Sequence, residues 1–260
     1  MSGRFHFDRT TPVTAATLTA YVALAMLTGG EQILTPDPAK LDRFGAAIGA
    51  RIAHGEIWRL VANTYLHGGV VHLLFNAMSL WSFGPQLERL IGSLRFLVLY
   101  LVAGVGGSVA GVLWHSPFSP LIGGSGAIFG MLGAMVALNA RHGKSPLDFL
   151  QYEGPRQLVS LIFANLVLGF VIPQVSNAAH LGGLLAGFVL MHQFHERHGR
   201  HAPDRLGRIV QAGWLTVFAT GVLWCAFPLT RWDVLLVRHE STQDDTLRRE
   251  LAEALAIKRH

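Results

Sequence analysis

The sequence predicts an all-α, polytopic membrane protein: a helical bundle with a six-helix core and a seventh, C-terminal transmembrane helix. Hydrophobic residues make up 51% of the 260 residues and charged residues 14%, whereas an average soluble domain has roughly 25% charged residues. The apolar residues gather in long runs between short polar segments, as in helices that cross a bilayer. Basic residues collect in those segments and account for the formal net charge of +5, so the charge indicates membrane topology and no nucleic-acid partner.

The first half of the chain supplies three of the expected helices. Residues 1–12 form a short cytoplasmic tail, and residues 13–28 form the first membrane helix, with no cleavable signal peptide expected. Residues 31–66 form a long connection whose apolar stretches are too short to span, so we expect it to lie partly in the membrane interface. The second and third helices are expected at residues 70–87 and 94–113.

The second half begins with a helix that carries no charge from Ser125 to residue 140. At ~1.5 Å per residue this run is ~24 Å long, less than the ~30 Å hydrocarbon core, so the helix should begin inside the bilayer. The remaining segments are a polar loop at 141–156, a fifth helix at 158–172, a sixth at 178–192, a basic cytoplasmic linker at 196–208, a seventh helix at 209–228 and a charged tail at 229–260.

The orientation of the bundle follows from the lysines and arginines of its short loops. Those at positions 89, 95, 141, 144 and 156, with the arginines of the basic linker, all fall on one side of the predicted helices. That side should be cytoplasmic, which places the N-terminus inside. The second, fourth and sixth helices then all enter the membrane from its outer side and run parallel.

Polar residues mark the outer ends of these three parallel helices. Ser125 begins the fourth helix within Gly123-Gly124-Ser125-Gly126, His180 lies near the start of the sixth, and His72 and Asn76 lie in the second. The simplest interpretation of Ser125 alone is a helix N-cap in a glycine-rich turn. The four residues lie ~18–24 Å above the cytoplasmic ends of their helices, so their side chains can meet in one site.

These side chains can perform acyl transfer. A serine hydroxyl becomes a nucleophile when a base takes its proton, and histidine is the usual base at neutral pH. Ser125 and His180 form such a pair, while His72, Asn76 and the backbone N–H of Ser125 can stabilise the oxyanion. The predicted membrane helices contain no aspartate to serve as a third member, so the site is predicted to be a dyad.

Two glycine pairs flank this dyad. Gly126 and Gly130 follow the serine, and Gly183 and Gly187 follow the histidine. The small-xxx-small spacing lets membrane helices approach at close backbone distance. The fourth and sixth helices are therefore expected to pack against each other beside the site.

Taken together, the motifs resemble those of the rhomboid intramembrane serine proteases. The matching patterns are Gly123-x-Ser125-Gly126, His67-x4-His72-x3-Asn76 and His180-x2-Gly183-x3-Gly187, with Trp58-Arg59 in the first connection, and together they cover about residues 56–193. Phe129 stands where some members have a tyrosine that stacks on the base. The resemblance implies a six-helix catalytic core, here residues 13–195, in a multi-pass protein of a bacterial inner membrane.

The resemblance also implies residue roles and partners. Ser125 is then the nucleophile, His180 the general base, His72 and Asn76 the oxyanion side chains, and His67 a structural histidine, with Trp58, Arg59, Gly124, Gly126, Phe129, Gly183 and Gly187 in support. The substrates would be transmembrane segments cut near the outer membrane boundary, with the bilayer as the surrounding partner and no cofactor or metal. The motifs specify no oligomeric state.

Two other functions remain alternatives. Thirteen histidines, among them His192, His195, His198 and His201, could indicate a metal-binding membrane protein, but no HExxH signature is present. A solvated histidine face at a basic helix end is the ordinary interpretation of this stripe. A catalytically inactive relative that binds membrane-protein clients should lack the serine or the histidine, and both are present.

Overall fold

The computed structural model describes residues 11–29, 36–53, 55–142, 175–192 and 249, and within them the ordered elements are helices. They are α1 (Pro12–Thr28), α2 (Pro38–Phe44), α3 (Gly49–Ala53), α4 (Arg59–Ala62), the 3₁₀ turn η1 (Asn63–Tyr65), α5 (Val70–Ile91), α6 (Ser93–Trp114), α7 (Ser125–His142) and α9 (Asn177–Met191). The starts of the five long helices match the sequence prediction to within one residue.

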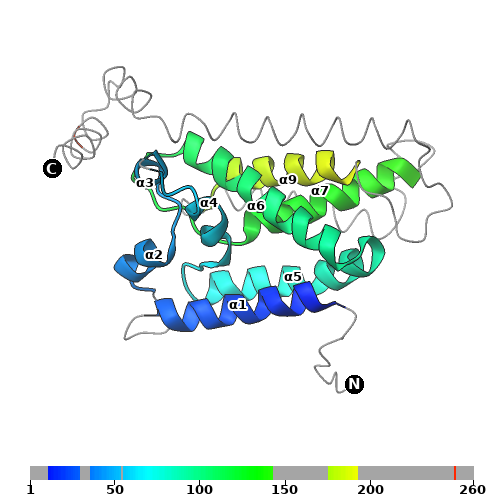
Figure 1. The fold of residues 1–260 in the computed structure, drawn as a ribbon, viewed down its shortest axis with the longest axis horizontal. Helices are drawn as coiled ribbons and strands as arrows, with labels where there is room; N and C mark the ends of the chain where they lie inside the picture. Colours follow the sequence, from blue (N-terminus) through cyan, green and yellow to red (C-terminus); the bar gives the residue numbers. More distant parts are fainter. Residues whose placement is uncertain (1–10, 30–35, 54, 143–174, 193–248, 250–260) are drawn as a thin grey trace.

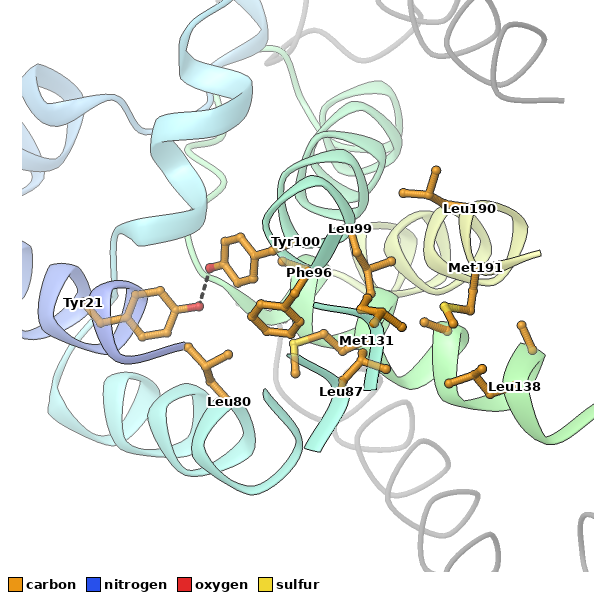
Figure 2. Close-up of a cluster of buried hydrophobic side chains, with 14 residues drawn as sticks. Tyr21, Leu80, Leu87, Phe96, Leu99, Tyr100, Met131, Leu138, Leu190 and Met191 are labelled. Carbon is orange, nitrogen blue, oxygen red and sulfur yellow. Dashed lines mark hydrogen bonds between the residues drawn. The ribbon is translucent and has the colours of Figure 1, made fainter. Parts of the chain in front are cut away.

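The long helices pack in two groups joined by α6. Helices α1 and α5 lie side by side, while α7 and α9 form the most extensive pair, with α6 packed against both of them (Figure 1). The short helices α2, α3 and α4 gather at one end of the bundle (Figure 1). The apolar core between the groups contains large fully buried side chains from α1, α5, α6, α7 and α9 (Figure 2).

The end of α5 departs from the prediction. The helix continues past residue 87 to Ile91, and Glu88 is 1% exposed within the bundle. Its carboxyl oxygens accept hydrogen bonds from the backbone N–H groups of Val13 (3.0 Å) and Thr14 (2.8 Å) and from the Thr14 hydroxyl (2.7 Å). Glu88 therefore caps the N-terminus of α1, whose otherwise unpaired N–H groups and positive dipole end favour a carboxylate.

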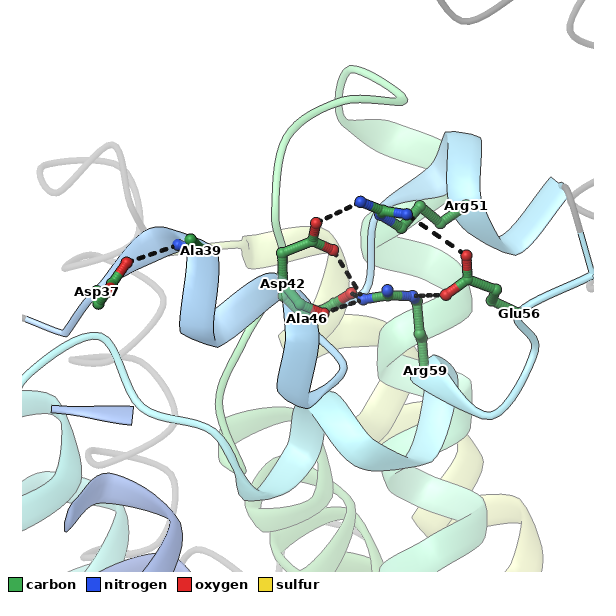
Figure 3. Close-up of polar contacts among 7 residues, drawn as sticks. All are labelled: Asp37, Ala39, Asp42, Ala46, Arg51, Glu56 and Arg59. Carbon is green, nitrogen blue, oxygen red and sulfur yellow. Dashed lines mark hydrogen bonds and ion pairs between the residues drawn. The ribbon is translucent and has the colours of Figure 1, made fainter. Parts of the chain in front are cut away.

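The connection after α1 folds around a buried arginine. The guanidinium of Arg59, in a side chain that is 4% exposed, lies 3.1 Å from Asp42 and 2.7 Å from Glu56 and donates hydrogen bonds to the carbonyl groups of Asp42 and Ala46 (Figure 3). Arg51 bridges the same two acids from outside (Figure 3). The cluster ties α2, α3 and α4 into one unit. The connection thus contains short helices, a detail that its apolar pattern did not predict.

Glycines set the close contact of α7 with α9. A Cβ added at Gly183 would overlap the carbonyl oxygen of Gly126, and one added at Gly187 would overlap that of Gly130. The backbones of the two helices therefore touch where the paired glycines predicted a close approach.

Among the described helices, α6 is long and apolar enough to cross a membrane, with a mean hydropathy of 2.2. Helices α1, α7 and α9 contain shorter apolar stretches. The expected fifth helix at 158–172, the basic linker and the seventh helix lie outside the described residues, as do most of the polar loop at 141–156 and all of the charged tail except residue 249.

Candidate active site

The turn before α7 places Ser125 at the first position of the helix. Gly123 has φ +122°, in the left-handed region that favours glycine, and its N–H donates to the carbonyl of Asn63 at 2.9 Å. The N–H of Ile128 bonds to the carbonyl of Gly124 at 2.9 Å. A reciprocal pair of hydrogen bonds between Ala47 and Leu121 anchors the preceding loop to the first connection.

His180 lies in the first turn of α9, and a well-capped helix start holds it there. The Ser176 hydroxyl accepts the N–H of Ala179 at 3.2 Å, as in an N-cap, and lies 2.8 Å from Nε2 of His115. The backbone N–H of His180 donates to the carbonyl of Ser176 at 3.1 Å. His115 is the C-cap of α6, so its contact with Ser176 joins α6 to α9 beside His180.

The structure brings the starts of α7 and α9 together at Gly107 of α6. A Cβ added there would lie 2.8 Å from the Ala179 carbonyl oxygen and 3.1 Å from the Gly126 Cα. These two atoms belong to the neighbours of His180 and Ser125 in the sequence. The candidate base and nucleophile therefore project from helix turns that share one contact point.

Phe129 packs against the candidate base. Its ring is stacked on that of His180, with the centroids 4.1 Å apart and the planes 7° from parallel. Both side chains are buried, at 3% and 4% exposure. Within the described residues, Nδ1 of His180 has no hydrogen-bond partner, and the Phe129 ring packs flat against the imidazole.

His72 and Asn76 face the turn from α5. The Nδ1 atom of His72 accepts the backbone N–H of Gly68 at 3.2 Å, so a neutral His72 ring carries its proton on Nε2. A Cβ added at Gly123 would lie 2.8 Å from that Nε2 and 3.9 Å from Nδ2 of Asn76. One N–H of Asn76 Nδ2 donates to the His72 carbonyl at 3.1 Å. The Nε2–H of His72 and the second N–H of Asn76 are thus donors beside the turn.

His67 lies behind this pair in the loop before α5. Its ring is 2% exposed and stands edge-on to the rings of Tyr21, 4.5 Å away, and His72, 5.3 Å away. Burial, with a smaller effect from His72, lowers the pKa of His67 below its usual value, so its ring is neutral at physiological pH. The neutral ring fills the space between α1 and His72.

Trp58 and Arg59 lie at the start of α4, away from the turn. The Arg59 guanidinium is 4.9 Å from the centroid of the Trp58 ring. The carbonyl of Arg59 accepts a hydrogen bond of 2.6 Å from the side chain of Asn63, whose own carbonyl holds Gly123. The charged cluster around Arg59 therefore supports the turn through Asn63 without touching it.

Residues 54–197 match the family model of the rhomboid domain. The chain belongs to the rhomboid family. The matched region contains all the site residues described above, from Trp58 to Gly187. The resemblance inferred from the motifs is thereby confirmed.

Similar proteins carry rhomboid names. The chain is 45% identical over 145 residues to rhomboid protease GluP of Bacillus subtilis, covering 56% of this chain and 27% of that protein. It is 38% identical over 163 residues to RHOMBOID-like protein 5 of Arabidopsis thaliana, covering 61% of this chain and 50% of that protein. Identity to the putative rhomboid protease YdcA of B. subtilis is 34% over 139 residues, which are 54% of this chain and 68% of that protein.

Membership of the rhomboid family makes this chain a polytopic, multi-pass membrane protein with an all-helical fold. Helices α5, α7 and α9, which carry the candidate catalytic and oxyanion residues, lie within the matched region. The chain spans 27% of GluP and about half of several plant relatives. No cluster of three histidine, cysteine or acidic side chains fit for a metal ion occurs among the residues that the structure describes. Of the histidine stripe, His192 alone is described.

Sequence reasoning missed several residues that support the fold or this rhomboid site. They are Glu88, which caps α1; Asn63, which holds Gly123; and the pair His115 and Ser176, which caps α9. An acid within an apolar helix is a signal that could have revealed Glu88. The other contacts join residues far apart in the chain, and no local pattern records them.

Proposed function

We propose that this rhomboid protein is an intramembrane serine endopeptidase with a catalytic dyad of Ser125 and His180. The observation that carries the proposal is the stack of Phe129 on His180, which fixes the imidazole against the helix that Ser125 begins. The names of GluP and YdcA as rhomboid proteases support it. A hydrolase needs no cofactor for this chemistry.

In the first half-reaction, Oγ of Ser125 attacks the carbonyl carbon of the scissile peptide bond. His180 takes the hydroxyl proton as the C–O bond forms, and the carbonyl π electrons move to the oxygen. When the tetrahedral intermediate collapses, the C–N bond breaks and His180 gives its proton to the leaving amine. The product is an ester of Ser125 with the N-terminal fragment.

The oxyanion of this intermediate is the charge that the site must stabilise. The Nε2–H of His72, the second N–H of Asn76 and the backbone N–H of Ser125 are the proposed donors. The hydrogen bond from Gly68 to His72 Nδ1 supports this role, because it leaves the proton on the nitrogen nearer Gly123. In a site shielded from water, such donors stabilise the transition state more than the bound substrate.

In the second half-reaction, water attacks the ester and His180 again acts as the base. The proton passes from water to His180 and then to the Ser125 oxygen as the ester bond breaks. The N-terminal fragment leaves with a new C-terminal carboxylate, and the free enzyme is restored. Phe129 keeps the imidazole in one plane throughout both half-reactions.

We further propose the membrane arrangement that the loop charges indicate. The N-terminus is cytoplasmic, α5, α7 and α9 enter from the outer side, and a seventh span follows the basic linker. Ser125 then lies several Å below the outer surface, so the substrate is the outer part of a transmembrane segment. The substrate must unwind there, because a peptide bond inside a helix is shielded by its own hydrogen bonds.

A serine-directed fluorophosphonate tests the proposal directly. The purified full-length protein should be labelled on Ser125, and Ser125→Ala and His180→Ala variants should not be labelled although they fold. Intact thermal midpoints show that the variants fold. A wild-type protein that resists labelling would favour the alternative, a catalytically inactive rhomboid that binds membrane-protein clients. Labelling of the Ser125→Ala variant would refute the assigned nucleophile.

A further inference from the structure

Two buried tyrosines meet behind the catalytic turn. Tyr21 of α1 and Tyr100 of α6 are both 0% exposed, and their hydroxyl oxygens are 2.6 Å apart in a hydrogen bond (Figure 2). A buried hydroxyl is costly unless it is paired, and this pair lies among apolar side chains. The two hydroxyl groups therefore satisfy each other in a position where phenylalanine would have packed without that cost.

The Tyr21 hydroxyl abuts the backbone of Gly124. A Cβ added at Gly124 would overlap the Tyr21 oxygen and lie 2.6 Å from the ring carbon that bears it. The hydroxyl thus occupies the space that a side chain at this position would take. Gly124 directly precedes Ser125, and the orientation of the peptide bond between them sets the direction of the Ser125 N–H.

The backbone of Gly124 needs a restraint if the Ser125 N–H is to point in a fixed direction. Glycine has more backbone freedom than any other residue, and two consecutive glycines precede the nucleophile. A donor aimed at a developing charge must be held in place before the reaction. The Asn63 carbonyl holds the N–H of Gly123 at 2.9 Å, but it does not reach Gly124. The Gly124 carbonyl accepts the Ile128 N–H at 2.9 Å, and the side chain that lies against the Gly124 backbone is that of Tyr21.

Tyr100 fixes the position of that hydroxyl. Its own hydroxyl lies 3.4 Å from the Thr64 carbonyl, to which it donates, so Tyr21 can donate to the Tyr100 oxygen in a directed chain. The Thr64 carbonyl also lies 3.1 Å from the Cβ position of Gly124. Tyr21, Tyr100 and Thr64 thus come from α1, α6 and η1 and converge on one glycine.

We propose that Tyr21 is a positioning residue for the catalytic turn, held by its hydrogen bond to Tyr100. Its hydroxyl restricts the backbone of Gly124 and so aligns the Ser125 N–H with the oxyanion. This inference rests on the proposed protease function, because it assigns Tyr21 to the transition state of that reaction. It gives α1, which supplies none of the proposed catalytic side chains, a role in turnover.

The Tyr21→Phe variant tests the inference, because it keeps the ring and removes the oxygen. We expect the fluorophosphonate labelling rate and kcat for a transmembrane peptide to fall about fivefold, the effect of about one hydrogen bond, with KM unchanged. The Tyr100→Phe variant should lower kcat in the same direction. If Tyr21→Phe yields no folded protein, the Tyr100→Phe variant tests the inference in its place.

The matched control is Tyr65→Phe. The Tyr65 ring belongs to the same cluster, 6.2 Å from that of Tyr21 and 5.8 Å from that of Tyr100, and its hydroxyl makes no hydrogen bond within the described residues. We expect its labelling rate and kcat to equal those of the wild type. A purely structural role of Tyr21 would lower the thermal midpoint and leave kcat of the folded protein unchanged, which would overturn the inference.

The same experiment separates this inference from the proposed function. If the wild type is labelled on Ser125 and both Tyr21→Phe and Tyr65→Phe are labelled at the wild-type rate, the protease assignment stands and the role of Tyr21 is wrong. If the wild type is not labelled, both are wrong.

Discussion

Replacing Asn76 with alanine isolates one oxyanion donor. Asn76 is 4% exposed on α5, and its Nδ2 lies 3.9 Å from the Cβ position of Gly123. One of its N–H groups is used in the hydrogen bond to the His72 carbonyl. The other is the donor that the Asn76→Ala variant would remove from the transition state.

The expected loss of kcat is that of one oxyanion donor. Removal of one oxyanion donor costs ~3 kcal/mol of transition-state stabilisation, so kcat should fall roughly 100-fold. KM should hardly change, because the charge is absent from the bound substrate. The lost bond to the His72 carbonyl should lower the free energy of unfolding by only about 1 kcal/mol. A double change with His72→Ala should cost less than the sum of the single changes, because the two donors act on one oxygen.

The assay is steady-state cleavage of a single-span fluorogenic peptide by purified protein in detergent, with thermal unfolding measured on the same samples. Ser82→Ala is the matched control, because Ser82 lies on the same helix and makes the same kind of bond, to the Met78 carbonyl at 2.8 Å. It should lose no activity. If Asn76→Ala keeps kcat within about twofold of the wild type, Asn76 is not an oxyanion donor.

Three further predictions concern the supports of the site. Phe129→Ala should lower kcat because the His180 ring loses its stacking partner, whereas Phe129→Tyr keeps the ring and should remain active; equal rates for both variants would show that another group orients the base. Gly183→Ala inserts a Cβ against the Gly126 carbonyl and should lower the thermal midpoint and kcat together, by an overpacking cost of ~1–3 kcal/mol, while Leu181→Ala, at a position 53% exposed, should change neither. Glu88→Gln weakens the cap of α1 and should lower the free energy of unfolding by about 2 kcal/mol in a denaturant titration, with kcat of the folded protein retained; an unchanged stability would show that the cap contributes little.

Sequence patterns predicted the helix starts because those patterns are local. The absence of charge after Ser125 and the glycines before it define where α7 begins, and the structure has the helix there. The glycine spacing predicted the contact of α7 with α9, because only a residue without a side chain permits that backbone distance. Each of these inferences uses residues within one or two helical turns.

Contacts between distant segments could not be predicted in this way. The predicted end of the second helix at residue 87 is wrong, because the helix continues to Ile91 and the Glu88 carboxyl group is buried against the start of α1. Similarly, Tyr21 and Tyr100 are separated by 79 residues, and neither occurs in a recognisable motif. Their roles depend on which helices pack together, which only the folded structure reveals.

The most direct test of the central claim is to map the cut made in a single-span reporter reconstituted with the full-length protein in liposomes. Mass spectrometry should place the cleaved bond near the outer boundary of the reporter's transmembrane segment. Replacing glycine or proline in the outer part of that segment with leucine should slow cleavage, because the helix unwinds less readily. The Ser125→Ala variant should produce no fragment. Cleavage by that variant, or a cut at the cytoplasmic end, would contradict the account.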